Sequence, residues 1–253
     1  MIRRTFLILP RVGRKAERSI WMEGIERWDD FLRSERVRGF SPERKRQCDS
    51  MISVAERFLR SGQTRYFTRI LPGSEQWRMY ECLERDVAYL DIETDGLSCD
   101  AEVTVVGIHR AGETRTLVKG IDLDSAALAE ELGRCRMLVT YNGSSFDLPI
   151  LQYHFPFAMP QVPHMDLRHA CNRIGLKGGL KSVERALGIR RPSEVEFVTG
   201  EEAAYLWKMW RKRGSRNALS LLRRYNEEDT RNLESIARHA YEALSERTLS
   251  EVA

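Results

Sequence analysis

The chain lacks a long uncharged apolar run, which excludes a membrane-spanning helix. Glycine and proline are not enriched, with 17 and 8 among 253 residues, so collagen-like and low-complexity chains are excluded as well. No C-x-x-C motif is present, which argues against a zinc ribbon or a redox-active dithiol. The cysteines are odd in number and widely spaced, so we expect reduced thiols and a cytoplasmic location. They are Cys48, Cys82, Cys99, Cys135 and Cys171.

Hydrophobic residues make up 42% of the chain and charged residues 31%, as in a globular protein with one large domain or two smaller ones. The net charge of +4 is unevenly distributed. Residues 1–80 hold 18 basic and 10 acidic side chains, whereas the remainder holds 23 and 27. A basic N-terminal third can meet a polyanion, and an acidic remainder can hold cations. A solvated, arginine-rich surface explains the same imbalance.

Residues 1–85 are expected to form a small all-helical region. Apolar residues recur there at helical spacing in two stretches, 20–32 and 51–59. Ser41 and Pro42 are typical of a helix start, with serine as the cap and proline at the first helical position.

From residue 86 onward, strands alternate with helices. The expected strands are 87–92, 102–110, 114–118 and 137–141, of which the second and third form a hairpin. The expected helices are 124–135, 146–153, 167–174, 179–187, 200–212 and 216–243. This order predicts an α/β fold, with a mixed sheet flanked by helices, over residues 86–245. A tail follows at 246–253.

Two acidic residues end the first expected strand, in the sequence Asp91-Ile92-Glu93-Thr94-Asp95-Gly96. Side chains alternate along a strand, so Asp91 and Glu93 point to the same face. Adjacent carboxylates at the end of a buried strand repel each other and are costly to desolvate, and a divalent cation removes that cost. Such oxygen ligands favour Mg²⁺ or Mn²⁺ over zinc. A solvated turn at residues 95–96 explains this motif equally well when it is taken alone.

A second acidic element runs from Asn142 to Asp147. It starts where another strand ends, crosses a Gly/Ser turn and opens a helix, so Asp147 is expected in the first helical turn. An ordinary acid stabilised by the helix dipole fits the same place. Asp166, ahead of the next helix, is expected to act as a helix cap.

A third element lies in the C-terminal helix. Tyr225 and Asp229 are four residues apart and therefore share one helix face, where a phenol and a carboxylate can meet the same site. A surface acid beside an amphipathic tyrosine is the alternative. The neighbouring Glu227 and Glu228 are expected to face solvent.

In this order and on these elements, the motifs D-x-E, N-x-x-x-F-D and Y-x-x-x-D resemble those of a known family. The chain is similar to the DEDD 3′–5′ exonucleases of the ribonuclease H-like fold, in their tyrosine-containing (DEDDy) subgroup, over about residues 86–240. The stretch GGLKSVERALGI at residues 178–189 and the helical segment ahead of the first motif most resemble the YprB-type predicted exonucleases.

The resemblance implies a ribonuclease H-like fold and a metal-dependent 3′–5′ exonuclease. Such an enzyme hydrolyses phosphodiester bonds of DNA or RNA with two Mg²⁺ or Mn²⁺ ions per site and releases 5′-mononucleotides. By position, Asp91 would bridge both ions, Glu93 and Asp229 would complete the first metal site, and Asp147 would hold the second ion. Tyr225 would orient the attacking water. The expected partner is a nucleic acid with a single-stranded or fraying 3′ end.

Contacts to nucleic acid are expected in two places. Residues 9–17, LPRVGRKAE, resemble the hairpin of a helix-hairpin-helix, in which Arg11, Arg14 and Lys15 would meet phosphates. A packing helix with solvated arginines explains the same residues. In the second motif, Asn142 and Phe146 are expected to contact the nucleic acid.

Two other functions remain open at this stage. A structure-selective endonuclease on the same fold is disfavoured by Tyr225 and Asp229, because that pair belongs to the exonucleolytic group. A non-catalytic or partner-activated nucleic-acid-binding module is disfavoured by the complete carboxylate set.

Overall fold

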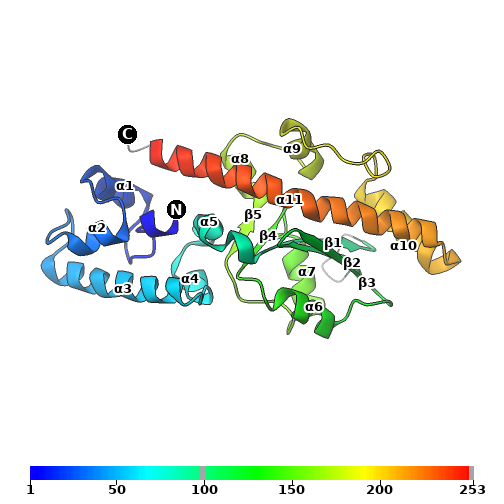
Figure 1. The fold of residues 1–253 in the computed structure, drawn as a ribbon, viewed down its shortest axis with the longest axis horizontal. Coiled ribbons are helices and arrows are strands. Elements are labelled where there is room, and N and C mark those ends of the chain that lie inside the picture. The colour runs from blue at the N-terminus through cyan, green and yellow to red at the C-terminus, as the bar shows by residue number, and fades with distance from the viewer. Residues whose placement is uncertain (97, 99–100, 251–253) are drawn as a thin grey trace.

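The computed structural model describes residues 1–96, 98 and 101–250 (Figure 1). Cys99 and positions 251–253 of the expected tail therefore lie outside the described residues. The α-helices are α1 (Arg14–Met22), α2 (Trp28–Arg33), α3 (Pro42–Arg60), α4 (Arg65–Ile70), α5 (Tyr80–Leu83), α6 (Ser125–Leu132), α7 (Asp147–His154), α8 (Leu167–Arg173), α9 (Leu180–Ala186), α10 (Gly200–Arg213) and α11 (Arg216–Ser250). The 3₁₀ helices are η1 (Ile2–Arg4), η2 (Gly73–Met79) and η3 (Glu84–Asp86). The strands are β1 (Val87–Thr94), β2 (Val103–Arg110), β3 (Glu113–Val118), β4 (Met137–Thr140) and β5 (His164–Asp166).

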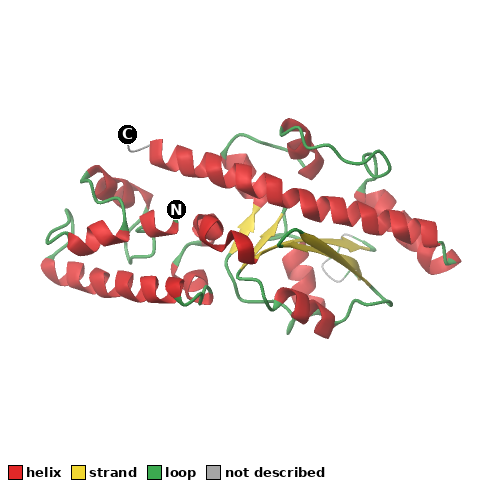
Figure 2. Cartoon of the chain, in the orientation of Figure 1, coloured by secondary structure: helices red, strands yellow, loops and turns green. Residues whose placement is uncertain are grey.

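The strands form one mixed sheet in the order β3-β2-β1-β4-β5 (Figure 2). The pairs β1–β2 and β2–β3 are antiparallel, whereas β1–β4 and β4–β5 are parallel. The register places Leu90 opposite Ile108 on one side of β1 and Tyr89 opposite Val139 on the other. The α/β fold with a mixed sheet flanked by helices is thus confirmed. Strand β5 is absent from the expected strands, because its three residues are too few to show a periodic pattern.

Alternation along β1 separates the two faces of the sheet. Leu90 and Ile92 are buried together with apolar side chains of α6 and α7. Val87 and Tyr89 are buried with apolar side chains of α11. In Figure 1, α11 crosses one face of the sheet, and α6 and α7 lie below the other. The same alternation directs residue 91 toward α11.

The region before the sheet is helical, as expected, and lies at one end of the molecule (Figure 1). Helix α3 begins at the predicted cap, where the Ser41 side chain accepts a hydrogen bond from the Arg44 backbone N–H. The apolar stretch 20–32 is divided between α1 and α2. Gly24 lies between these helices with a φ of +80°, a conformation that glycine adopts without strain.

The core of the N-terminal region continues into the sheet domain. One buried cluster contains Phe31 and Trp77 from the N-terminal region, Tyr89 from β1, and Leu233 and Ile236 from α11. The expected boundary at residue 85 therefore separates elements of secondary structure that share a core.

The last helix, α11, is 35 residues long and runs to Ser250, so residues 246–250 are helical. Among the described residues, no helix has both the length and the apolar character that crossing a membrane requires. The described cysteines are free: Cys48, Cys82, Cys135 and Cys171. The cytoplasmic location stays a prediction.

Candidate active site

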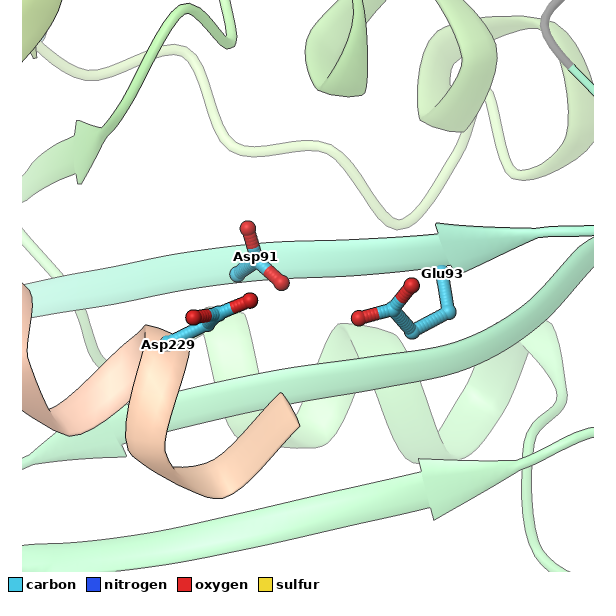
Figure 3. A group of neighbouring side chains, drawn as sticks. All are labelled: Asp91, Glu93 and Asp229. Atoms are coloured by element: carbon cyan, nitrogen blue, oxygen red, sulfur yellow. The ribbon is translucent and has the colours of Figure 1, made fainter. Parts of the chain in front are cut away.

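Strand β1 presents Asp91 and Glu93 on the face of the sheet that α11 covers (Figure 3). Asp91 is half-buried and Glu93 is buried. The pairing of β1 with β2 shifts register between Glu93 and Thr94, so the regular ladder is interrupted directly after the second carboxylate. The two acids therefore occupy the last regular positions of a strand whose other side is packed with apolar residues.

Helix α11 adds a third carboxylate, the buried side chain of Asp229. Oxygen atoms of Asp91, Glu93 and Asp229, one from each, lie within 4.8 Å of one another (Figure 3). Asn226, almost one helical turn earlier, donates from Nδ2 to Asp91 Oδ2 at 2.9 Å. This bond ties the helix to the strand at the site and orients the Asp91 carboxylate.

The close approach of α11 to the sheet depends on Gly107 of β2. A Cβ atom at this position would lie 2.2 Å from Thr230 Oγ1 and 2.3 Å from Asn226 Oδ1. Both distances are far shorter than a van der Waals contact, so only glycine fits here without displacing the helix.

The fourth carboxylate, Asp147, begins α7, as predicted. Its Oδ1 accepts a hydrogen bond from the backbone N–H of Ile92 at 3.2 Å, which attaches the start of α7 to β1 between the first two acids. Burial raises the pKa of Asp147 to about 7. Its charge helps to raise the pKa values of Asp91 and Glu93, so Asp147 belongs to the same acidic site.

The loop between β4 and α7 is held by Asp166. Its carboxylate accepts hydrogen bonds from the backbone N–H groups of Asn142 at 2.9 Å and Ser144 at 3.0 Å. It also accepts from the N–H of Arg168 at 3.0 Å, which confirms the predicted helix cap. Asn142 takes a φ of +66°, a left-handed conformation that asparagine tolerates better than most residues. Asp166 therefore sets the shape of the loop that leads to Asp147.

Burial and mutual repulsion disfavour full ionisation of the cluster. Burial, and next the charge of Asp229, raise the pKa values of Asp91 and Glu93 well above their usual range. Burial also raises the pKa of Asp229, although the Arg191 guanidinium opposes this shift. Without a further positive charge, the group therefore retains protons that isolated carboxylic acids would lose.

The positive charge already present comes from Arg191, which the sequence motifs did not indicate. Its guanidinium forms a bidentate pair with Glu184, from Nε to Oε2 and from Nη2 to Oε1, both at 2.7 Å. Nη2 also forms an ion pair with Asp229. Glu184 is itself held by Asn232 Nδ2 at 3.0 Å. The arginine is thus fixed, buried, against one of the clustered acids.

Tyr225 is buried one turn before Asp229 on α11. The ammonium nitrogen of Lys181 lies 5.4 Å from the centre of its ring, and the Arg191 guanidinium lies 5.8 Å from it. Burial, followed by the nearby carboxylates, raises the pKa of Tyr225. The phenol is therefore neutral at physiological pH, with the Asp229 carboxylate beside it as a hydrogen-bond acceptor.

A cavity of about 390 Å³ opens onto these groups and is called the carboxylate cavity below. It is lined by Asp91, Ile92, Glu93, Thr94, Gly96, Tyr141, Asn142, Phe146, Asp147, Gly200, Glu201, Ala204, Tyr225 and Asp229. All five residues predicted to be catalytic line this one cavity. Asn142 and Phe146 of the second motif line it too.

The three basic residues predicted to bind nucleic acid at the N-terminal turn do not line the carboxylate cavity. All three are exposed: Arg11 lies in the turn before α1, and Arg14 and Lys15 lie in its first turn. The turn follows the short 3₁₀ helix η1, whereas a helix-hairpin-helix has an α-helix on both sides. Arg14 forms an ion pair with the buried Glu75.

The expectation for the two acids ahead of Asp229 needs a correction. Glu228 is buried and pairs with Arg231 at 2.6 Å, so it does not face solvent. Glu227 is half-buried, and its Oε1 accepts from Thr116 Oγ1 at 3.4 Å. Helix α11 is packed on more than one side, which a single amphipathic stripe does not reveal.

Comparison with known proteins decides the family. A family model described as the RNase_H superfamily matches residues 88–241, which is more than half of the chain and contains every motif residue of the site. The chain belongs to the RNase H superfamily. A solved structure, that of the family B DNA polymerase from the hyperthermophilic archaeon Pyrobaculum calidifontis, is similar at 17% identity with a TM-score of 0.45. The match covers 64% of this chain and 24% of the polymerase chain. No curated protein matches.

RNase H-like nucleases typically use divalent metal ions, and the residues of this member fit such ions. Asp91, Glu93 and Asp229 supply hard oxygen donors within one ion's reach of one another. The cluster contains neither sulfur nor imidazole, which zinc would favour. The repulsion that raises the pKa values of these acids is the cost that a bound cation removes. The site is therefore suited to a hard divalent cation.

Proposed function

We propose that this RNase H-like protein is a metal-dependent 3′–5′ exonuclease of the DEDDy type, most similar to the YprB-type group. The observation that carries the proposal is the convergence of four carboxylates and one neutral tyrosine on the carboxylate cavity. Three separate elements, β1, α7 and α11, supply these groups. The motif order and the fold context support the DEDDy assignment together.

The proposed reaction is the hydrolysis of the terminal phosphodiester bond. Water attacks the phosphorus, the bond from phosphorus to the 3′ oxygen breaks, and that oxygen takes up a proton, releasing a 5′-mononucleotide. Asp91, Glu93 and Asp229 would hold the first of two Mg²⁺ or Mn²⁺ ions, and Asp147, with Asp91, the second. Bound ions supply a more acidic water and neutralise charge on the transferred phosphoryl group.

Tyr225 and Asn142 are the chain's own candidates for positioning the substrate. The neutral phenol donates a hydrogen bond and orients the attacking water, which agrees with its raised pKa. Asn142 and Phe146 line the same cavity, where an amide and an aromatic ring can contact the terminal nucleotide. The nucleic acid would enter with a single-stranded or fraying 3′ end.

The deciding experiment compares single-stranded DNA and RNA labelled at either end, with Mg²⁺, Mn²⁺ or EDTA. A 5′-labelled strand should shorten in single-nucleotide steps, and a 3′-labelled strand should release a labelled mononucleotide first. Asp229→Asn should lower the cleavage rate. Replacing a residue that only hydrogen-bonds to a metal ligand typically costs roughly 10–100-fold, and the loss in Asp229→Asn should be far larger.

Three results would contradict the proposal. Internal fragments from both labels would indicate an endonuclease. Cleavage that survives both EDTA and Asp229→Asn would place the activity outside the carboxylate cavity. Binding without any cleavage would indicate a non-catalytic module.

A further inference from the structure

One face of α10 continues from the carboxylate cavity toward the end of the helix. Three residues at the start of α10 line that cavity: Gly200, Glu201 and Ala204. Lys208 lies one helical turn beyond Ala204 on the same face, and Lys212 lies one turn further. At about 1.5 Å per residue, the helix advances about 12 Å from Ala204 to Lys212. A ligand that extends from the cavity along α10 therefore passes both lysines.

Another face of α10 packs against the protein and fixes the helix in place. Ala203 and Trp207 are buried in one cluster with Leu222 of α11. Helix α10 lies beside α11 at the end of the molecule opposite the N-terminal region (Figure 1). This packing leaves Lys208 and Lys212 exposed.

The two lysines carry charges that no neighbouring acid neutralises. Across the residues that the structure describes, neither side chain forms an ion pair or a hydrogen bond. Lys212 lies in the last turn of α10, where its charge complements the helix dipole, but Lys208 precedes that turn. The acids of α10, Glu201 and Glu202, lie in its first turn. The helix dipole therefore does not account for Lys208.

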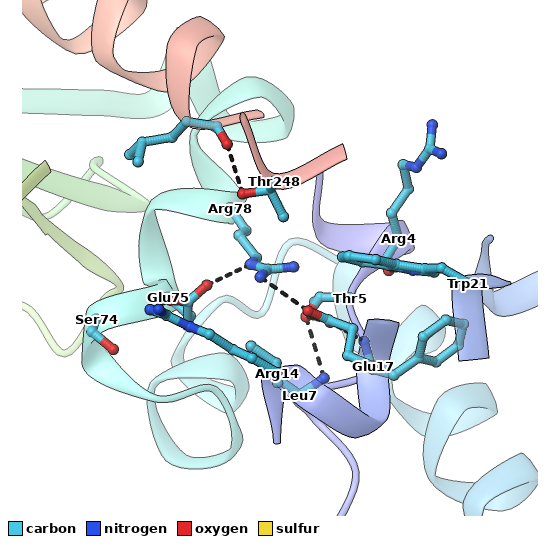
Figure 4. Close-up of polar contacts among 12 residues, drawn as sticks. Arg4, Thr5, Leu7, Arg14, Glu17, Trp21, Ser74, Glu75, Arg78 and Thr248 are labelled. Carbon is cyan, nitrogen blue, oxygen red and sulfur yellow. Dashed lines mark hydrogen bonds and ion pairs between the residues drawn. The ribbon is translucent and has the colours of Figure 1, made fainter. Parts of the chain in front are cut away.

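The arginines at the junction between the N-terminal region and α11 differ in this respect (Figure 4). Arg78 donates from Nε to Glu75 Oε2 at 2.7 Å and from Nη2 to Glu17 Oε2 at 3.1 Å. Arg14 forms an ion pair with Glu75 as well. These charges connect parts of the fold, whereas those of the two lysines on α10 are open to a ligand.

Tyr205 adds an aromatic ring beside the lysines. It directly follows Ala204 of the carboxylate cavity, precedes Lys208 by three residues and is 60% exposed. Residues three apart are neighbours on a helix surface, so the ring and the ammonium group belong to one surface. Proteins that bind single-stranded nucleic acid combine such groups, with aromatic rings that stack on bases and cations that contact phosphates.

We propose that the α10 face, formed by Tyr205, Lys208 and Lys212, binds the single strand whose 3′ end lies in the carboxylate cavity. Tyr205 stacks on a base next to the cavity, and the lysines contact phosphates further along the strand. At about 3.4 Å per stacked nucleotide, about 12 Å of helix corresponds to about three or four nucleotides. The 3′ end as the occupant of the cavity rests on the proposed exonuclease function.

The first arm of the test measures binding without hydrolysis. Fluorescence anisotropy follows 5′-labelled oligothymidylates of 2, 6 and 12 nucleotides in EDTA. Affinity should rise at least about tenfold from 2 to 6 nucleotides and then change little. The double variant Lys208→Gln/Lys212→Gln should lose this rise, and its slope of log affinity against log salt should be smaller by about 1.4 for two phosphates. Glutamine has a helix propensity close to that of lysine, so α10 should remain folded.

A control variant separates the lysines from net charge. Arg46→Gln/Arg69→Gln also removes two positive charges, from exposed positions of α3 and α4. Its affinity for the 6-nucleotide strand and its salt slope should stay near the parent values.

The second arm tests the stacking role of Tyr205. Tyr205→Ala should weaken binding of the 6-nucleotide strand about tenfold, and Tyr205→Phe, which keeps the ring, should restore it. An abasic strand of the same length should bind parent and Tyr205→Ala equally. Tyr153→Ala removes a tyrosine of α7 that is 68% exposed, and it should have no effect.

The third arm connects the α10 face to cleavage. With Mg²⁺ and the 12-nucleotide strand, the lysine double variant should raise KM at least about tenfold and leave kcat near the parent value, because the lysines bind the strand away from the reacting bond. A dinucleotide is too short to reach the lysines, so parent and variant should cleave it equally.

The outcomes separate this proposal from the proposed function. Weaker binding of the longer strands in the lysine variant, with equal cleavage of the dinucleotide, supports the α10 face. Equal binding by the lysine variant and the arginine control overturns it. A loss of affinity that is the same for all strand lengths would show general attraction of polyanions and would also overturn it. If the parent binds strands but cleaves none, the exonuclease assignment fails, while the binding arms still decide the α10 face.

Discussion

Arg191 supplies the permanent positive charge of the carboxylate cluster. It is buried, it pairs with Asp229 and Glu184, and the acids around it repel one another. A divalent cation bound to the same carboxylates would add to the positive charge of Arg191 and neutralise them further. The arginine therefore lets the chain fold with four acids at one site before any cation is bound, which a purely acidic cluster would oppose.

Replacing this arginine should expose that role. In EDTA, Arg191→Met should lower the free energy of unfolding by about 3–5 kcal/mol, because it leaves buried carboxylates without a counter-charge. Mg²⁺ should then raise the melting temperature of the variant more than that of the parent, since the ion becomes the main compensation. Arg46→Met, an exposed change on α3, is the matched control. An equal Mg²⁺ effect in variant and parent would refute this account.

Tyr225 is expected to act as a neutral hydrogen-bond donor. Tyr225→Phe should lower the rate of mononucleotide release by about 10²-fold, because the water loses its orienting partner while the ring remains packed. The stabilisation by Mg²⁺ should stay near the parent value, since no carboxylate is removed. Differential scanning fluorimetry beside the cleavage assay separates the two effects. A variant that loses Mg²⁺ stabilisation as well would place the phenol in a structural role.

His164 gives a pH dependence of stability that can be isolated by substitution. Burial lowers the pKa of His164 from 6.5 to about 4, and its Nε2 lies 2.9 Å from Thr140 Oγ1. Between pH 6.5 and 4 this histidine is therefore protonated in the unfolded chain but stays neutral in the folded chain. The stability contributed by the neutral ring is fully present above pH 6.5 and is lost as the pH falls through 4. The total is about 3 kcal/mol.

Urea unfolding of the parent and of His164→Gln from pH 4 to 7 measures this contribution. As the pH falls, the unfolding free energy of the parent should decrease more than that of the variant, because only the parent has the buried histidine. A difference that stays constant with pH would show that the histidine is not buried in its neutral form.

At the scale of elements, the site depends on how closely α11 lies on β2. Gly107→Ala would place a methyl group 2.2 Å from Thr230 Oγ1, so either Asn226 or the helix must move. The expected loss of unfolding free energy is about 1–3 kcal/mol. Mg²⁺ stabilisation should fall as well, because Asn226 orients Asp91. Gly73→Ala, where an added Cβ meets nothing within 4 Å, is the control. Unchanged Mg²⁺ stabilisation in Gly107→Ala would refute this dependence.

The same scale explains what could be read from the sequence. Asp91 and Glu93 share a face because strands alternate, and Tyr225 and Asp229 share a face because helices repeat; both rules act within one element. Arg191 could not be found in this way. It lies between α9 and α10 in a segment without a regular pattern, and it reaches Asp229 only through the tertiary fold. The burial of Glu228 was missed for the same reason, since it depends on what packs beside α11.

At the scale of the whole molecule, the N-terminal helices and the RNase H-like sheet share one apolar core. Met79 of η2 is fully buried in the cluster that also holds Tyr89 and Ile236. A pocket of about 400 Å³ lies at the same junction, lined by residues of α1, η2, α8 and α11. The helical region is thus placed to support the sheet domain.

A shared core predicts a single unfolding transition. Three of the five tryptophans, Trp21, Trp28 and Trp77, lie before the sheet, so fluorescence reports mainly on that region, whereas far-ultraviolet circular dichroism includes the 35 residues of α11. Met79→Ala should lower both melting temperatures together by about 5–15 °C, because it opens a cavity at the junction. Met22→Ala, at a position 76% exposed, should leave both unchanged. If the fluorescence transition moved alone, the helical region would unfold independently of the sheet domain, which would contradict a shared core.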